Sequence, residues 1–174
     1  MENPLTLYTE LDTINNIVFK TLGFSISNFE KETESQEYHA SKFSLNNKSI
    51  IYRFAKNTPK KIGQFVTIWK RNDAGITASF NENDNLDYFI IACIKENNFG
   101  FFIFPKSILL ENKILSTNNI DGKRGIRVYP TWDQATNKQA LKTKEWQSQY
   151  FVEIDKELNA DSHDYHELKR FFDK

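Results

Sequence analysis

The chain of 174 residues has little of several features that would mark a specialised class of protein. Its one cysteine, Cys93, excludes an internal disulfide, and its four prolines and six glycines argue against a disordered or repetitive chain. No apolar run reaches the roughly 18 residues that an ordinary membrane-spanning helix needs. The first residues, Met-Glu-Asn-Pro-Leu, lack the basic and apolar stretches of a secretory signal, so we expect none. Together these absences favour a protein of the reducing cytoplasm.

What the chain does contain is enough apolar material for a packed core. Hydrophobic residues make up 39% of the sequence and aromatic residues 14%, including 15 phenylalanines. The length favours one domain over residues 1–174. Cys93 lies inside the apolar run Tyr88–Ile94, where a buried and unreactive thiol is expected.

Hydrophobic periodicity predicts helices near both ends of the chain. Apolar residues recur at spacings of three and four between Leu7 and Leu22, which predicts a helix over 4–22, opened by Asn3 and Pro4 and ended near Gly23. A second helix is expected over about residues 136–151. The charged segment 152–174 is expected to hold a short helix that carries Tyr165, Leu168 and Phe171-Phe172.

The strands are predicted between these helices. Apolar or alternating runs indicate a hairpin joined by Asn46-Asn47, two central antiparallel strands and two further strands: Tyr38–Leu45, Ser49–Ala55, Gln64–Lys70, Tyr88–Lys95, Gly100–Phe104 and Ile126–Tyr129. Asp73–Asp87 is expected to be a polar connection. The fold class that follows is a single α+β domain with a mostly antiparallel or mixed central sheet flanked by helices.

Charge is segregated along the sequence although the net charge is zero. Between Lys42 and Arg71, the basic window, there are eight basic residues and no acidic residue. Over the whole chain, 23 lysines and arginines balance 23 aspartates and glutamates. Such segregation predicts one face with a positive potential and therefore an anionic partner.

Four segments resemble a known protein family. They are Ala55–Arg71, which includes Thr58-Pro-Lys-Lys-Ile-Gly63, then Phe102–Lys106, Gly122–Asp133 and Thr136–Phe151. In combination they resemble the MepB-like family, with the strongest similarity over residues 38–151. The family takes its name from a bacterial multidrug-efflux operon, so the resemblance implies a cytoplasmic bacterial protein. It implies no particular reaction and no catalytic residues.

The basic residues form three groups that suit phosphate contacts. The first lies in the basic window, the second surrounds a turn bracketed by Gly122 and Gly125, and the third is on the late helix. If the groups converge in the fold, they form a cationic groove for a nucleic acid or another polyanion. The predicted phosphate-binding residues are Lys56, Lys60, Lys61, Lys70, Arg71, Lys106, Lys123, Arg124 and Arg127, with Trp69 and Trp132 as stacking candidates and Lys138, Lys142 and Lys144 as the third group.

Catalytic chemistry has weaker support in the sequence. A restriction-endonuclease-type site needs an acid-x-Lys strand, but Gly100-Phe-Phe-Ile-Phe-Pro-Lys106 has no acid. A restriction-endonuclease-like fold without an intact catalytic motif therefore stays open. Asp161, His163 and His166 are a weak metal-binding pattern, and His39 has no evident partner. We expect no cofactor, no metal and no assigned catalytic residue.

Two other functions stay open beside nucleic-acid binding. One is a small-molecule or nucleotide-handling enzyme that uses the same cations as a phosphate pocket, with Glu37, Asp87 or Asp133 as acid, base or metal ligand. The other is an accessory factor of a drug-efflux system that binds a protein partner through exposed apolar surface such as Phe171-Phe172. The sequence distinguishes neither DNA from RNA nor one oligomeric state from another.

Overall fold

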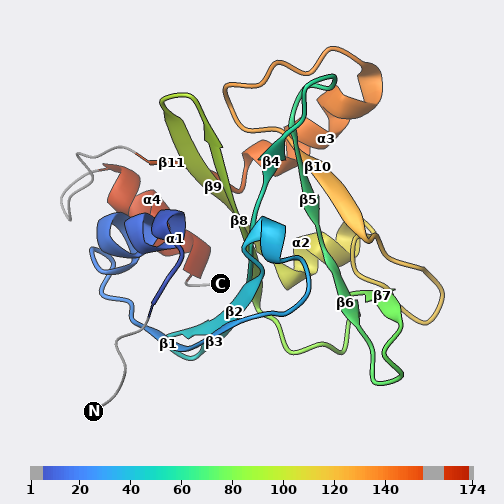
Figure 1. The fold of residues 1–174 in the computed structure, drawn as a ribbon. Helices are drawn as coiled ribbons and strands as arrows, with labels where there is room; N and C mark the ends of the chain where they lie inside the picture. Colours follow the sequence, from blue (N-terminus) through green and yellow to red (C-terminus); the bar gives the residue numbers. More distant parts are fainter. Residues whose placement is uncertain (1–5, 155–162, 173–174) are drawn as a thin grey trace.

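A six-stranded sheet divides the molecule, and helices and a smaller sheet cover its two faces (Figure 1). The structure, a computed structural model, describes residues 6–154 and 163–172. The strand order is β1-β2-β3-β8-β9-β11, with only β3 and β8 parallel. These strands span Ile26–Lys31, Ser41–Leu45, Lys48–Phe54, Tyr88–Lys95, Asn98–Pro105 and Phe151–Glu153. The predicted α+β class with a mixed central sheet is confirmed.

A second, smaller layer lies over one face of this sheet. It contains the three-stranded sheet β10-β5-β4 (Gly125–Val128, Gln64–Thr67 and Lys56–Asn57) and the hairpin of β6 and β7 (Trp69–Arg71 and Thr77–Ser79). The predicted strand Gln64–Lys70 is divided into β5, which pairs with β10, and β6, which pairs with β7. Ile68 lies between them, and its amide donates to Arg124 O at 3.0 Å. The predicted connection Asp73–Asp87 contains β7.

Two hydrophobic cores follow from the alternation of side chains along the central strands. In β8, Tyr88, Ile90 and Ala92 face one core, and Phe89, Ile91 and Cys93 face the other. Since both faces are covered, β8 has the continuous apolar sequence of a doubly buried strand. Cys93 is fully buried, as the sequence predicted.

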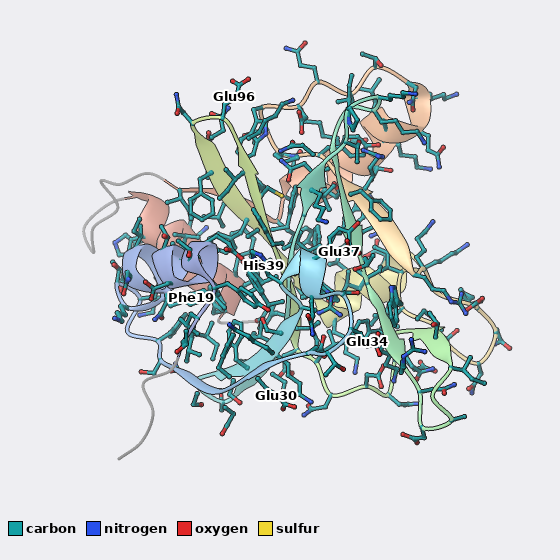
Figure 2. All side chains as sticks on the ribbon, viewed as in Figure 1. Phe19, Glu30, Glu34, Glu37, His39 and Glu96 are labelled. Atoms are coloured by element: carbon teal, nitrogen blue, oxygen red, sulfur yellow. The ribbon has the colours of Figure 1, made fainter. Side chains whose placement is uncertain are left out.

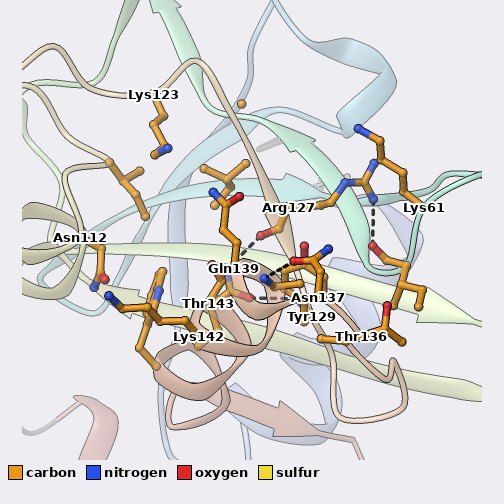
Figure 3. Close-up of a pocket in the computed structure, with 18 of the residues that line it drawn as sticks. Lys61, Asn112, Lys123, Arg127, Tyr129, Thr136, Asn137, Gln139, Lys142 and Thr143 are labelled. Carbon is orange, nitrogen blue, oxygen red and sulfur yellow. Dashed lines mark hydrogen bonds between the residues drawn. The ribbon is translucent and has the colours of Figure 1, made fainter.

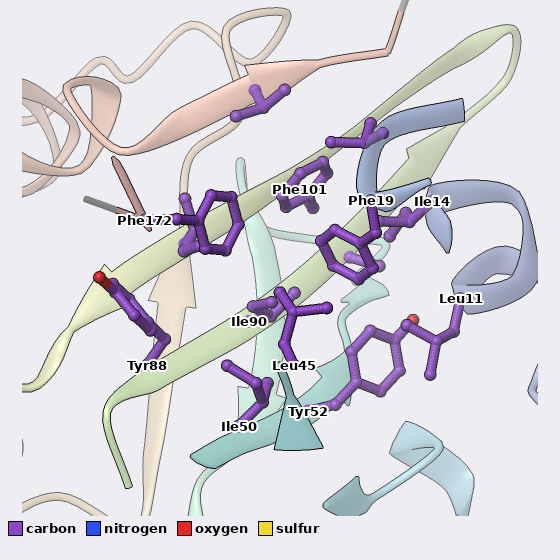
Figure 4. Packing of buried hydrophobic residues seen from close by; sticks show 14 of the residues in the cluster. Leu11, Ile14, Phe19, Leu45, Ile50, Tyr52, Tyr88, Ile90, Phe101 and Phe172 are labelled. Atoms are coloured by element: carbon purple, nitrogen blue, oxygen red, sulfur yellow. The ribbon is translucent and has the colours of Figure 1, made fainter. Parts of the chain in front are cut away.

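Helices from both ends of the chain cover the first core (Figure 4). Helix α1 (Thr9–Ile14) continues as a π-helical turn, Asn15–Phe19, and the chain turns at Gly23 with φ of +80°. The helix expected over 4–22 is therefore shorter, and Asn3 and Pro4 lie outside the described residues. Helix α4 (His163–Phe172) is present where a terminal helix was expected.

The expectation that Phe171-Phe172 is exposed is wrong for Phe172, which is buried, whereas Phe171 is half-buried. Phe172 is only 8% exposed and packs with its ring centroid 6.1 Å from that of Phe19. The hydroxyl of Tyr88 donates to Phe171 O at 2.8 Å. The apolar side of α4 therefore packs against the central sheet and forms part of the first core.

Two further helices lie on the side of the smaller sheet. Helix α2 (Lys106–Glu111) follows β9 directly, and α3 (Lys138–Ser148) lies beside β10. The side chain of Asn137 caps α3 by accepting from the amide of Ala140 at 2.8 Å. Within residues 6–154 and 163–172, no helix is long and apolar enough to cross a membrane.

Replacing Phe19 with alanine should strongly destabilise the fold. Phe19 has no exposed surface and contacts Phe101 and Phe172 edge to face. Loss of its ring should lower the free energy of unfolding by about 3–5 kcal/mol. Urea denaturation measures the change, with the 52% exposed Leu141→Ala as control. A loss for Phe19→Ala no larger than that of the control contradicts this packing.

Stability should also fall at alkaline pH. Burial raises the pKa of the Cys93 thiol, and burial beside Glu10 raises the pKa of the Tyr52 phenol. The unfolded chain loses these protons first, so the free energy of unfolding falls once pH exceeds about 8.5 for the thiol and about 10 for the phenol. Urea denaturation from pH 7.5 to 9.5 should show a smaller loss in Cys93→Ala than in the wild type. Equal losses contradict the assignment to Cys93.

Candidate phosphate-binding cleft

The basic window is not free of acids in three dimensions. Four glutamates between Glu30 and Glu37, the glutamate segment, pair with four of its basic residues. Figure 2 labels three of these glutamates, Glu30, Glu34 and Glu37. The pairs are Glu30–Lys42 at 3.5 Å, Glu32–Arg53 at 2.9 Å, Glu34–Arg71 at 2.6 Å and Glu37–Lys56 at 3.3 Å. Folding therefore mixes charges that the sequence separates, and only part of the basic window keeps unpaired cations.

Arg53 belongs to the core and not to a binding surface. Its side chain is 1% exposed, and its guanidinium carbon lies 5.9 Å and 5.7 Å from the ring centroids of Phe80 and Phe89. Burial lowers the pKa of the guanidinium, and the Glu32 carboxylate opposes that shift. The ion pair with Glu32 thus compensates a charge that would otherwise be isolated in an apolar environment.

Several other candidate residues also have local partners. Lys70 Nζ lies 2.5 Å from Asp84 Oδ1, and Lys106 Nζ donates to the main-chain oxygen of Asp84 at 2.7 Å. Arg124 Nη1 lies 3.5 Å from Asp121 Oδ2. The fold therefore turns these cations toward their own neighbours.

The two stacking candidates are both half-buried. The guanidinium carbon of Arg71 lies 5.5 Å from the ring centroid of Trp69 and covers it. Trp132 packs against Phe151 with a centroid distance of 5.5 Å. Neither indole lines the cleft described next.

Five cations from separate segments converge on one cleft of about 880 Å³ (Figure 3). They come from the β4–β5 loop, the turn before β10, β10 itself and α3: Lys60, Lys61, Lys123, Arg127 and Lys142. The lining contains no acidic residue. None of the five forms an ion pair with a described carboxylate. Residues from all three predicted basic groups thus meet in one place.

Two glycines allow the basic loops to lie close to their neighbours. Gly63 has φ of +86°, and a Cβ there would lie 2.8 Å from the Tyr129 ring. At Gly122 a Cβ would lie 2.4 Å from Ile114 O. A larger residue at either position would force the loop or its neighbour to move.

The wall formed by α3 is electrostatically unusual. Its first turn has no acidic residue, and lysines stand at positions 138 and 142. The N-terminal end of a helix carries partial positive charge and normally favours acids, so this arrangement favours a bound anion. Lys142 lines the cleft, whereas Lys144 is directed elsewhere and donates to Asp133 O at 2.6 Å.

Sequence reasoning missed Asn112 and Ile114, which line the cleft from the segment after α2. Neither residue has a local signature, since they reach the cleft only through the packing of α2 beneath it. Trp146 of α3 also lies in the cleft lining and is half-buried.

The carboxylates considered for catalysis lie outside this lining. Asp87 Oδ2 accepts from the amide of Ser49 at 2.8 Å, and the 3% exposed Asp133 lies 3.0 Å from Lys95 Nζ. Glu37 pairs with Lys56. Among the described residues, no group of three or more His, Cys, Asp or Glu side chains could hold a metal ion. Asp161 and the side chain of His163 lie outside what is described.

His39 has a partner that the sequence did not reveal. Its Nδ1 lies 2.6 Å from Glu10 Oε1, which also accepts from the Tyr52 hydroxyl at 2.9 Å. The imidazole stacks on Tyr8 with a centroid distance of 4.2 Å. Because Glu10 is on α1 and Tyr52 is on β3, this partly buried cluster joins the first helix to the central sheet.

The fold and the cleft together define a single-domain α+β protein with a cleft that five cations line. A family model described as MepB-like matches residues 32–153, and the chain belongs to the MepB-like family. A solved structure described as the crystal structure of MepB is similar, with 33% identity and a TM-score of 0.74, covering 86% of this chain and 99% of that one. The sequence resemblance is confirmed.

A second solved structure is more distant. It is the bacterial homing endonuclease I-Ssp6803I, with 12% identity and a TM-score of 0.44, covering 79% of this chain and 84% of the other. The restriction-endonuclease-like fold therefore stays a prediction. No curated protein matches the chain significantly.

The two kinds of charge pair in the glutamate segment should differ in energy. Glu32→Ala leaves the buried Arg53 without its carboxylate and should lower the free energy of unfolding by about 3 kcal/mol. Glu34→Ala breaks the exposed pair with Arg71 and should cost less than about 1 kcal/mol. Urea denaturation of both variants measures the difference. Equal costs contradict a core role for Arg53.

Proposed function

We propose that the cleft binds the phosphate backbone of a nucleic acid and that Lys60, Lys61, Lys123, Arg127 and Lys142 contact the phosphates. The observation that carries this proposal is the convergence of five cations on one cleft whose lining has no acid. Phosphate contacts supply most of the affinity in sequence-independent nucleic-acid binding, and they need donors placed along a groove.

Electrostatics favours an anion at this place in particular. Five like charges around about 880 Å³ repel one another, and the positive end of α3 adds to the potential. An anionic ligand relieves that repulsion. Lysines contribute mobile point charges, whereas Arg127 offers a planar fork suited to phosphate.

The proposal uses fewer residues than the sequence predicted. Lys56, Lys70, Arg71 and Arg124 pair with carboxylates, and Lys106 is bound to a main-chain oxygen. Aromatic surface in the cleft comes from Tyr129 and Trp146 in place of Trp69 and Trp132. The lack of a carboxylate in the lining supports binding over a nucleotide-handling enzyme.

Fluorescence anisotropy with labelled oligonucleotides at increasing salt tests the proposal. Five phosphate contacts predict a slope of log K against log salt of about −3.5 for a single strand and about −4.5 for a duplex. Lys60→Ala/Lys123→Ala should weaken binding and make the slope shallower by about 1.4–1.8. Lys70→Ala/Arg71→Ala removes the same charge outside the cleft and is the matched control.

Three results would contradict the proposal. One is no binding to single- or double-stranded DNA or RNA at low salt. Another is equal weakening by the two double variants, which would mean that net charge alone matters. The third is thermal stabilisation by a mononucleotide with Mg²⁺ but not by oligonucleotides, which would favour the nucleotide-handling alternative.

A further inference from the structure

One side of β10 has no neighbouring strand. In the three-stranded sheet, β10 pairs only with β5, which leaves main-chain groups on its other edge to be satisfied. Helix α3 covers this edge with a polar side chain, Gln147, which is 1% exposed. A buried amide at such a position needs partners for both its donor and its acceptor.

Gln147 replaces the missing strand. Its Oε1 accepts from the amide of Tyr129 at 2.9 Å, and its Nε2 donates to Arg127 O at 3.0 Å. The same helical face presents Thr143 and Gln139, four and eight residues earlier, to the cleft. The two hydrogen bonds therefore set where the α3 wall lies relative to β10.

Arg127 extends this connection to the opposite wall. Its Nη1 donates to Ile62 O at 3.2 Å and to Gly63 O at 3.4 Å, which holds the loop that carries Lys60 and Lys61. Figure 3 shows Arg127 between Lys61 and the side chains of α3. One chain of hydrogen bonds, from Gln147 through Arg127 to the β4–β5 loop, thus joins the walls of the cleft.

We propose that Gln147 is a positioning residue for nucleic-acid binding: it keeps Lys142 on α3 at the spacing from Arg127 and Lys61 that lets them contact phosphates simultaneously. The inference rests on the function proposed above. Gln147 borders the cleft but is only 1% exposed, and both ends of its amide are already bonded to the main chain, so it acts through these cations. Without Gln147 all five cations are still present, but fewer of them can contact phosphates of one nucleic-acid strand at the same time.

Gln147→Met tests this role, because methionine has similar length and no charge but forms neither hydrogen bond. Anisotropy across salt concentrations should show weaker binding and a slope shallower by about 0.7–0.9, the equivalent of one phosphate contact. A double-mutant cycle with Lys142→Ala should be non-additive, since Lys142 has already lost its contact in Gln147→Met. The cycle with Lys123→Ala, on the other side of the cleft, should be additive.

Other results would overturn the inference. Glu10→Gln is the control for a general loss of stability, because it disturbs the polar cluster of Glu10, His39 and Tyr52 away from the cleft. If Gln147→Met keeps the wild-type salt slope, or if both cycles are additive, Gln147 has only a structural role. If Gln147→Met does not fold, Gln147→Asn, whose shorter amide cannot reach both groups, serves in the same cycles. If the wild-type protein does not bind nucleic acid, the proposed function is wrong. If the wild type binds and the Gln147 variants bind equally well, only the role of Gln147 is wrong.

Discussion

The antiparallel pairing of β8 with β9 is the constraint on which the rest of the structure depends. Eight residue pairs join these strands, and their side chains alternate between two cores that lie on opposite faces of the sheet. Burial on both faces explains why the hydrophobic sequence there is continuous. Helices α1 and α4 cover one face, and the smaller sheet with α2 covers the other. The cleft lies in that second layer, away from the N-terminal helix.

Charge pairing then determines which cations are available to a ligand. The glutamate segment neutralises part of the basic window, and Arg53 is drawn into the core with its partner. Lys60 and Lys61 form no ion pair with a described carboxylate, and they line the cleft together with residues of β10 and α3. The available cations are thus defined by the path of the chain and not by local composition.

Local patterns were sufficient for the elements but not for their long-range partners. The hairpin at Asn46-Asn47 and the strands β8 and β9 could be predicted because apolar runs and turn residues are adjacent in sequence. The meeting of Lys60, Lys123 and Lys142 was a hypothesis that only the tertiary packing of three distant segments could test. Conversely, nothing near Arg71 in the sequence indicates Glu34, which is 37 residues away and pairs with it. Gln147 looks like an ordinary helix residue in the sequence, because its partners, Arg127 on β10 and Tyr129 just after it, are 20 and 18 residues away.

The five cations of the cleft lie apart from the ion pairs of the glutamate segment, so charge is unevenly distributed although the molecule is formally neutral. Attraction by net charge is absent, since 23 positive residues balance 23 negative ones. An approaching polyanion would instead exert a torque that turns the cleft toward it. The effect acts within a Debye length of about 10 Å at 0.1 M salt. The encounter with a polyanion would therefore depend on the orientation of the protein at short range. The isoelectric point would be a poor guide to the rate of that encounter.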